Sequence, residues 1–168
     1  MKTKLNKIVA AILALLMCSL IITACNDGSE ADDHLKLTQQ MIESRLSGGN
    51  GTLTINDGSA EDVTSFSYTF ESRYASSLRE KETVRYAVDK LRSGSSLTWF
   101  ETSMSVAFTE TMLVVGLIYD DTESFDADTY IEEILSVLCD GSRGFYNGWS
   151  IYATINEAQN TVTINCYT

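Results

Sequence analysis

The chain has 168 residues, with 12 Lys and Arg, 23 Asp and Glu, one His, four Cys and no Pro. This length corresponds to a single domain. The net charge of −11 at pH 7 excludes nonspecific binding to nucleic acid, because so acidic a chain repels a phosphate backbone. A hydrophobic share of 44% excludes disorder throughout and is ample for one packed core.

The first 24 residues have the pattern of an export signal. Lys2, Lys4 and Lys7 form a basic segment, and residues 8–24 are uncharged and largely apolar. A basic segment followed by an apolar one is typical of a secretory signal peptide. The apolar stretch is at the short limit for crossing a bilayer, so a single-span anchor is the alternative. Without these residues the chain has 9 basic and 23 acidic residues, a net charge of −14.

The signal ends in Ile22-Thr23-Ala24-Cys25, which resembles the lipobox of bacterial lipoproteins. Cys18 fits worse, because bulky Met17 stands where the lipobox has a small residue. The resemblance implies cleavage before Cys25, acylation of that residue, and a lipid anchor that holds the protein at the extracytoplasmic face of the cell membrane. Each buried acyl methylene contributes roughly 0.8 kcal/mol. An ordinary signal peptide, in which Cys25 is incidental, is the other interpretation.

A polar, acidic segment follows the proposed anchor. Residues 26–33 lack apolar spacing, so we expect residues 25–33 to form a lipid-anchored flexible tether. Eight residues span at most about 27 Å. Residues 34–168 then form one domain close to the membrane.

The first half of this domain predicts a helix, a hairpin and a second helix. A helical rhythm runs from Leu35 to Leu46, with Asp33 as its cap and Gly48 as its end. Alternating apolar residues predict two strands, at 53–55 and 66–70. In the next helix, Ser77 and Glu80 have capping-box spacing ahead of an apolar stripe that runs from residue 84 to residue 91.

The second half predicts a second hairpin, a third helix and a third hairpin. Residues 104–108 alternate, and residues 112–119 are nearly continuously apolar, as in a central strand covered on both faces. Asp126 is placed to cap a helix that ends at Gly141. Residues 149–155 and 162–166 alternate again, which favours a half-buried hairpin.

These elements predict an α+β fold, with an antiparallel sheet and about three helices packed on one face. The order of helix and two strands occurs three times at a spacing of about 48 residues. Repeats of this length are known among repeat proteins, so three αββ units are one interpretation. A simple α+β domain with a coincidental rhythm is the other.

Cys139 and Cys166 are the thiols of the predicted domain. An exported location permits a disulfide, and both residues are placed to face the core. A bridge would contribute roughly 3 to 4 kcal/mol in the chain-entropy estimate. Two buried free thiols are the alternative. Two cysteines are too few for a thiolate metal site.

The sequence gives little support for catalysis. His34, the single histidine, lies between the tether and the first helix, a poor place for a general base. Motifs for nucleotide, metal or serine-hydrolase chemistry do not occur, so we expect no cofactor and no metal. Paired Asp and Glu side chains would still allow an envelope hydrolase, although no particular pair stands out.

Two segments could bind a partner. Acidic residues cluster between Asp120 and Glu133 and would suit a cation or ligand carrier, but Phe125 and Asp126 break the calcium-loop pattern there. The loop 141–149 combines glycines with a cation and aromatic side chains, which is typical of binding surfaces: Arg143, Phe145, Tyr146 and Trp149. In the alternative interpretation, Asn147-Gly148 is a tight turn, and Phe145 and Trp149 cover the core.

Together, these features predict a membrane-anchored extracytoplasmic lipoprotein that serves as a noncatalytic binding or accessory component of the cell envelope. Its expected partners are the membrane, through the lipid, and an envelope protein or polymer. The hydrolase and the acidic carrier remain the alternatives.

Overall fold

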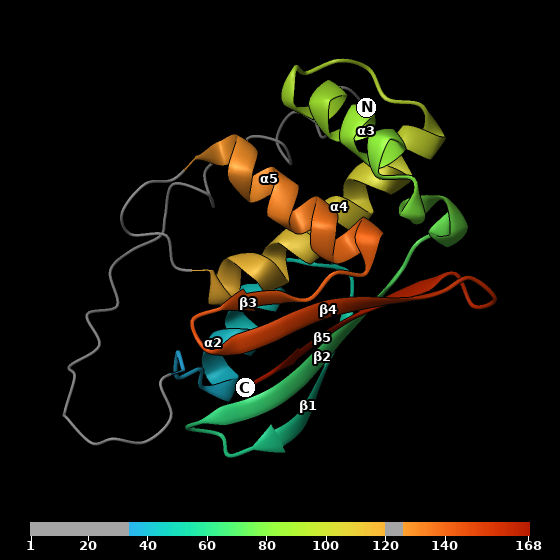
Figure 1. Cartoon of the computed structure of the whole chain (residues 1–168). Coiled ribbons are helices and arrows are strands. Elements are labelled where there is room, and N and C mark those ends of the chain that lie inside the picture. The colour runs from blue at the N-terminus through green and yellow to red at the C-terminus, as the bar shows by residue number, and fades with distance from the viewer. Residues whose placement is uncertain (1–33, 120–125) are drawn as a thin grey trace. The chain divides into compact units, whose positions relative to one another are not determined.

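The computed structural model describes residues 34–119 and 126–168 (Figure 1). The predicted signal peptide, Cys25 and the tether therefore lie outside the described residues. So do residues 120–125 of the acidic segment.

The described residues form helices and one five-stranded sheet. The sheet has the order β1-β2-β5-β4-β3, and all neighbouring strands are antiparallel. The predicted α+β class is therefore confirmed. In chain order, the elements are α2 (Gln39–Leu46), β1 (Thr52–Gly58), β2 (Val63–Glu71), the 3₁₀ helix η1 (Ala75–Arg79), α3 (Lys81–Arg92), α4 (Trp99–Ile118), α5 (Ala127–Leu135), the π-helical turn η2 (Ser136–Asp140), β3 (Gly144–Tyr146), β4 (Trp149–Asn156) and β5 (Thr161–Tyr167).

One face of the sheet is buried, and the helices cover it. The first and third predicted hairpins are confirmed, because their alternating apolar residues all enter the same core as the helices. Figure 1 shows α3, α4 and α5 on one side of the sheet. The inward residues of the two central strands are Phe66, Tyr68 and Phe70 on β2 and Val162, Ile164 and Cys166 on β5.

The predicted middle hairpin is wrong. Residues 104–108 and 112–119, expected as strands, belong almost entirely to the 20-residue helix α4. Thr98 caps it in a full capping box with Glu101. Its buried residues, among them Met104, Phe108 and Val115, follow one helical face. Apolar residues such as Val106, Leu113 and Leu117 also lie outside that face, so the helix lacks the one-sided apolar stripe by which helices are recognised. Without a middle hairpin, the three αββ units are also wrong.

Among the described residues, one helix, α4, is long and apolar enough to cross a membrane. Half of that stretch is buried inside the domain. Its neighbours include α2, α3 and α5. Because core helices pass the same test of length and composition, this is weak evidence for a membrane span.

Two helix starts differ from the prediction. α2 begins after Thr38, whose hydroxyl accepts a hydrogen bond from the Met41 amide, and not after Asp33. The preceding residues are not helical, because Leu37 forms a β-bridge with Val63. The Ser77 capping box is also wrong, because Ser77 lies within η1 and α3 begins after Glu80.

The last helix begins as predicted. The Asp126 carboxylate caps α5 by accepting a hydrogen bond from the Asp128 amide at 3.2 Å. The helical turns continue through η2 and end at Gly141. This glycine adopts φ +63°, a left-handed conformation that glycine tolerates best.

A buried carboxylate joins α4 to the start of the sheet. Glu110 is only 3% exposed, yet its oxygens accept hydrogen bonds from the Asn50 backbone amide at 3.0 Å and from the Tyr68 hydroxyl at 2.7 Å. The Asn50 side-chain amide donates a further bond at 2.8 Å. The Tyr68 hydroxyl in turn accepts from the Gly51 amide at 2.8 Å. Burial and the bond to Glu110 raise the pKa of Tyr68.

We predict that Glu110→Ala destabilises the domain strongly. The substitution leaves the buried Tyr68 hydroxyl without its acceptor and removes the bonds from the exposed Asn50, so the free energy of unfolding should fall by about 2 kcal/mol. Chemical denaturation of the variant measures this loss. The control is Glu43→Ala at an exposed carboxylate, which should cost less than about 0.5 kcal/mol. Equal losses in the two variants would show that the buried carboxylate does not organise the fold.

Candidate functional site

The second face of the sheet carries polar side chains in regular rows. Residues that pair across antiparallel strands point to the same side, so the registers define this face directly. Its side chains are mostly Ser, Thr and Asn. The rows are Phe145, Ser150, Tyr167, Ser65 and, across a register irregularity, Asp57, then Tyr152, Asn165, Ser67 and Thr54, and then Thr154, Thr163, Thr69 and Thr52. We call these residues, together with Arg143, the open face.

Arg143 lies over two tyrosine rings of the open face. Its guanidinium carbon is 5.4 Å from the centre of the Tyr152 ring and 5.9 Å from that of Tyr167. These two rings meet edge to face, with their centres 6.1 Å apart. Cation–π attraction therefore holds the guanidinium on the sheet. Among residues 34–119 and 126–168, Arg143 forms no ion pair with a carboxylate.

The polar side chains of this face are partly bonded to one another. The hydroxyls of Thr69 and Thr163 share a hydrogen bond of 2.9 Å across β2 and β5. The Asn165 amide donates to the Thr154 hydroxyl at 3.2 Å. A hydroxyl can donate once and accept twice, so each of these groups retains hydrogen-bonding capacity.

Carboxylates lie only at the margins of the open face. Glu71 ends β2, and Asp57 lies at the irregular end of the edge strand β1. The three rows on β2, β5 and β4 contain neither acid nor lysine. In so acidic a chain, this is a neutral surface with a single cation on it.

The predicted binding loop is divided between surface and core. Gly144–Tyr146 forms β3, and Asn147 and Gly148 make the tight turn to β4, with φ values of 49° and 78°. Arg143 is exposed, and Phe145 is 71% exposed on the open face. Phe145 therefore does not cover the core. The structure thus brings Arg143 and Phe145 to one surface, and it keeps two other members of the loop away from it.

Tyr146 and Trp149 have structural contacts instead. The Tyr146 hydroxyl donates to Glu133 at 2.6 Å, and burial together with this bond raises the pKa of Tyr146. Trp149 is fully buried, and its indole N–H donates to the Leu35 carbonyl at 2.8 Å. Trp149 therefore fixes the N-terminal segment of the domain to the sheet.

His34 is buried beside this tryptophan. Its side chain is 8% exposed, and its Nε2 lies 3.6 Å from Asp62 Oδ1. The His34 and Trp149 rings contact edge to face at 6.2 Å between centres. The structure thus places this histidine in a packed junction between the N-terminal segment and the sheet.

The structure contains no disulfide between Cys139 and Cys166. Cys139 on η2 and Cys166 on β5 are both free and buried, as in the alternative interpretation. Burial raises the pKa of Cys139 to about 12 and raises that of Cys166 as well. Because the thiolate is the reactive form, both thiols are protected in the folded chain.

The described acidic residues of segment 120–133 have structural partners. Asp126 caps α5, and its pKa is lowered chiefly by the hydrogen bond from the Thr129 hydroxyl. Asp128 pairs with Arg92 at 3.0 Å. Among the described residues, no group of three or more His, Cys, Asp or Glu is arranged to hold a metal ion. The described part of the segment therefore gives the cation-carrier hypothesis no site.

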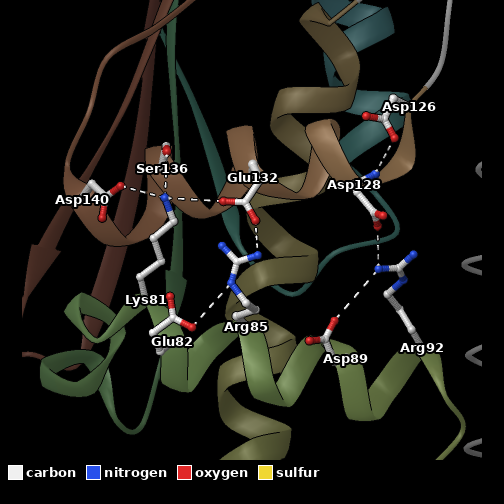
Figure 2. Close-up of polar contacts among 10 residues, drawn as sticks. All are labelled: Lys81, Glu82, Arg85, Asp89, Arg92, Asp126, Asp128, Glu132, Ser136 and Asp140. Carbon is white, nitrogen blue, oxygen red and sulfur yellow. Dashed lines mark hydrogen bonds and ion pairs between the residues drawn. The ribbon is translucent and has the colours of Figure 1, made fainter.

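Figure 2 shows these acids in an ion-pair network between α3 and α5. Glu132 pairs with Arg85, and this hydrogen bond lowers the Glu132 pKa more than any other contact does. Lys81 reaches Asp140 at 3.0 Å and the Ser136 hydroxyl at 3.1 Å. The network holds α5 and η2 on α3.

We predict that the contribution of Arg85 to stability depends on pH. Because Arg85 lowers the Glu132 pKa, the pair stabilises the fold above the pKa of an unfolded glutamate, about 4.3, and loses this effect as pH falls through the lower folded value. Arg85→Gln should therefore destabilise the chain at pH 7 and progressively less below pH 4.3. Urea denaturation of wild type and variant from pH 7 to pH 3 measures the difference. Arg79→Gln, at an exposed pair 3.7 Å long, is the control and should show little effect. A difference for Arg85→Gln that is the same at all pH values would contradict this.

A hollow of about 360 Å³ lies beside α2 and contains two carboxylates. Glu43 and Glu61 are both exposed there, and Gln39 donates to Glu43 at 2.6 Å. A hydrolytic carboxylate acid normally needs burial or a close like charge to hold its proton near neutral pH. The exposure of both groups gives the hydrolase hypothesis little support at this place. The lining residues are Thr38, Gln39, Gln40, Glu43, Ala60 and Glu61.

Two aromatic side chains are exposed away from the sheet. Trp99 begins α4, and Tyr86 lies on α3 with the Lys90 ammonium 5.5 Å from its ring centre. Lys90 is in turn paired with Glu101 at 2.8 Å. Isolated exposed aromatics are common on soluble domains and do not by themselves indicate a site.

No local sequence pattern marks Tyr152 and Tyr167 as binding residues. One feature of the sequence does indicate a binding surface: the residues of β4 and β5 that point away from the core include no charged side chain. Each tyrosine occupies such an outward position. Their approach to Arg143 follows from the pairing of β3, β4 and β5, which the sequence alone does not give.

Searches against protein-family models, curated proteins and solved structures found no match to this chain.

Proposed function

We propose that this protein is a lipid-anchored, extracytoplasmic binding component of the cell envelope, and that the open face is its binding surface. The observation that carries the proposal is the Arg143 guanidinium, held on Tyr152 and Tyr167 without a carboxylate partner among the described residues. The lipobox-like sequence that ends at Cys25 supports the location.

A sheet face suits binding because its side chains are fixed by the backbone hydrogen bonds of five strands. Rigid elements hold contact groups in place at low entropic cost. Aromatic residues and Arg are also the side chains most enriched where proteins contact partners. The open face combines aromatic rings and an arginine with hydroxyl and amide groups that can form further hydrogen bonds.

The geometry favours binding over catalysis. On β2, β4 and β5 the three rows of the open face contain no carboxylate, thiol or imidazole, which are the usual general bases and nucleophiles, and Asp57, the carboxylate in register with Ser65, lies at the irregular end of β1. The buried carboxylate of Glu110 is already engaged by Asn50 and Tyr68. The groups that the open face exposes are therefore suited to binding a ligand by hydrogen bonds, ring contacts and one cation.

We predict that Cys25→Ala abolishes acylation of the chain. The substitution removes both the thiol that would be acylated and the residue before which cleavage is implied, so the variant should keep its apolar segment and incorporate no labelled palmitate during growth of the producing cells. Cys18→Ala, a matched substitution within the apolar segment, should still incorporate the label. Labelled palmitate on the Cys25→Ala chain at the wild-type level would disprove the anchor.

We also predict that a charge at the centre of the open face weakens retention by envelope material. Asn165→Asp adds a carboxylate between Tyr152 and Ser67, where a partner would have to desolvate it. The measurement is cosedimentation of detergent-solubilised full chains with detergent-washed envelopes from the producing cells, where the added carboxylate should lower the retained fraction at least about fivefold.

The control for this experiment is Gln40→Glu, the same change from amide to acid on an exposed residue of α2. It should leave retention unchanged. Because Gln40 lines the hollow beside α2, release by this variant and not by Asn165→Asp would move the binding surface to the hollow.

A further inference from the structure

From the chemistry of the open face we infer that its ligand is a carbohydrate polymer bearing widely spaced carboxylates. This rests on the proposed function and specifies the ligand of the same surface. The inference follows from three properties of the face: its cation, its hydroxyl rows and its charge surroundings.

The guanidinium of Arg143 is suited to binding a planar anion such as a carboxylate. A guanidinium offers five N–H donors in a fixed fork that matches a carboxylate, and it binds one with two parallel hydrogen bonds. At 5.4 Å and 5.9 Å from two ring centres, Arg143 is held beside both tyrosines and is still exposed to solvent. Since Arg143 has no ion pair with a described carboxylate, the ligand would not have to displace one.

The rows supply the contacts that a sugar chain needs. Sugar rings carry hydroxyls around their edges and C–H groups on their faces. Ser67, Asn165 and Thr154 offer donors and acceptors at the regular spacing of the strands, about 4.8 Å from one strand to the next. Phe145 is 71% exposed at the end of the first row and presents an apolar surface for a ring face.

The charge of the chain limits how many anions the ligand can carry. After removal of the predicted signal peptide the net charge is −14, and Glu71 and Asp57 lie at the margins of the open face. A dense polyanion would be repelled by this field, whereas a single carboxylate at Arg143 would meet a neutral surface around it. A polyphosphate or a phosphate-rich polymer fits this surface less well.

The test is equilibrium binding of the detergent-solubilised full chain to polygalacturonate. The polymer is used in a partly methyl-esterified form, in which carboxylates are sparse, and in a fully esterified form, which has the same sugars without charge. We expect the partly esterified polymer to bind at least tenfold more tightly. Arg143→Gln should weaken that binding about tenfold to a hundredfold, which corresponds to loss of hydrogen bonds to a charged group.

Arg73→Gln is the matched control. Arg73 is also exposed, also lies over a tyrosine ring, at 5.8 Å from the centre of Tyr74, and its replacement changes the net charge by the same amount. It should not alter binding to the partly esterified polymer. An equal effect of both substitutions would mean that net charge alone is responsible and would overturn the inference.

Other outcomes separate this inference from the proposed function. If the wild-type chain binds neither polymer but Asn165→Asp still releases it from envelopes, the open face binds a ligand of another class, and only the carbohydrate inference fails. Equal affinity for the two polymers would remove the role of the carboxylate. If the Asn165→Asp substitution has no effect on envelopes either, both proposals fail.

Discussion

Burial of one face of the sheet against α4 is the contact on which the other features of the domain depend. The inward side chains of β2 and β5 and the side chains around α4 belong to one apolar core. A helix with apolar residues on more than one face needs several neighbours to bury them, and α4 contacts the helices α2, α3 and α5 as well as the strands β2 and β5. The helices α2, α3, α4 and α5 each contribute residues to the core on this side, which leaves the opposite side of the sheet for polar residues.

Polar contacts at the edges of the core join neighbouring elements to one another. Glu110 extends from α4 to the segment before β1 and satisfies its amides, while the pairs of Arg85 and Arg92 hold α5 on α3. A buried carboxylate is tolerated because donors surround it, and breaking such an arrangement costs more than making it contributes. Exposed pairs contribute less individually, since solvent screens them.

The open face follows from the same arrangement. Because each strand alternates, a sheet with one apolar face necessarily presents its other residues in rows at fixed spacing. Here the rows are neutral hydroxyls, amides and aromatic rings, with Arg143 held on two of the rings. The proposed lipid anchor would keep this surface near the membrane, and the rigid sheet would present it without a conformational change.

The sequence predicts the parts of this fold in which local pattern and final environment agree. The outer hairpins alternate because one of their faces is buried, and the start of α5 is marked by Asp126, whose side chain makes the predicted cap. For α4 the local pattern was misleading. Residues 104–108 alternate by chance, and apolar residues outside the buried face, such as Leu113 and Leu117, blur the helical stripe, although Thr98 and Glu101 have the spacing of a capping box.

The binding loop could be foreseen only in part for a similar reason. Arg143 and Phe145 reached the surface, whereas Trp149, next to them in sequence, became the anchor for Leu35. Composition identifies aromatic and cationic residues but does not say which side of a strand each one takes. The contact of Arg143 with Tyr152 and Tyr167 depends on the register of three strands, which is a tertiary property.

Thiol reactivity on the two sides of one hairpin tests the central claim most directly. In a full chain with Thr154→Cys, the new thiol lies on the open face, whereas Cys166 points into the core. Trypsin cuts after Arg143, so both positions lie on one peptide, and fragmentation of that peptide locates the label. Iodoacetamide should modify position 154 in the native chain and Cys166 only after unfolding. Protection of position 154, or rapid modification of Cys166, would contradict a sheet with one buried and one open face.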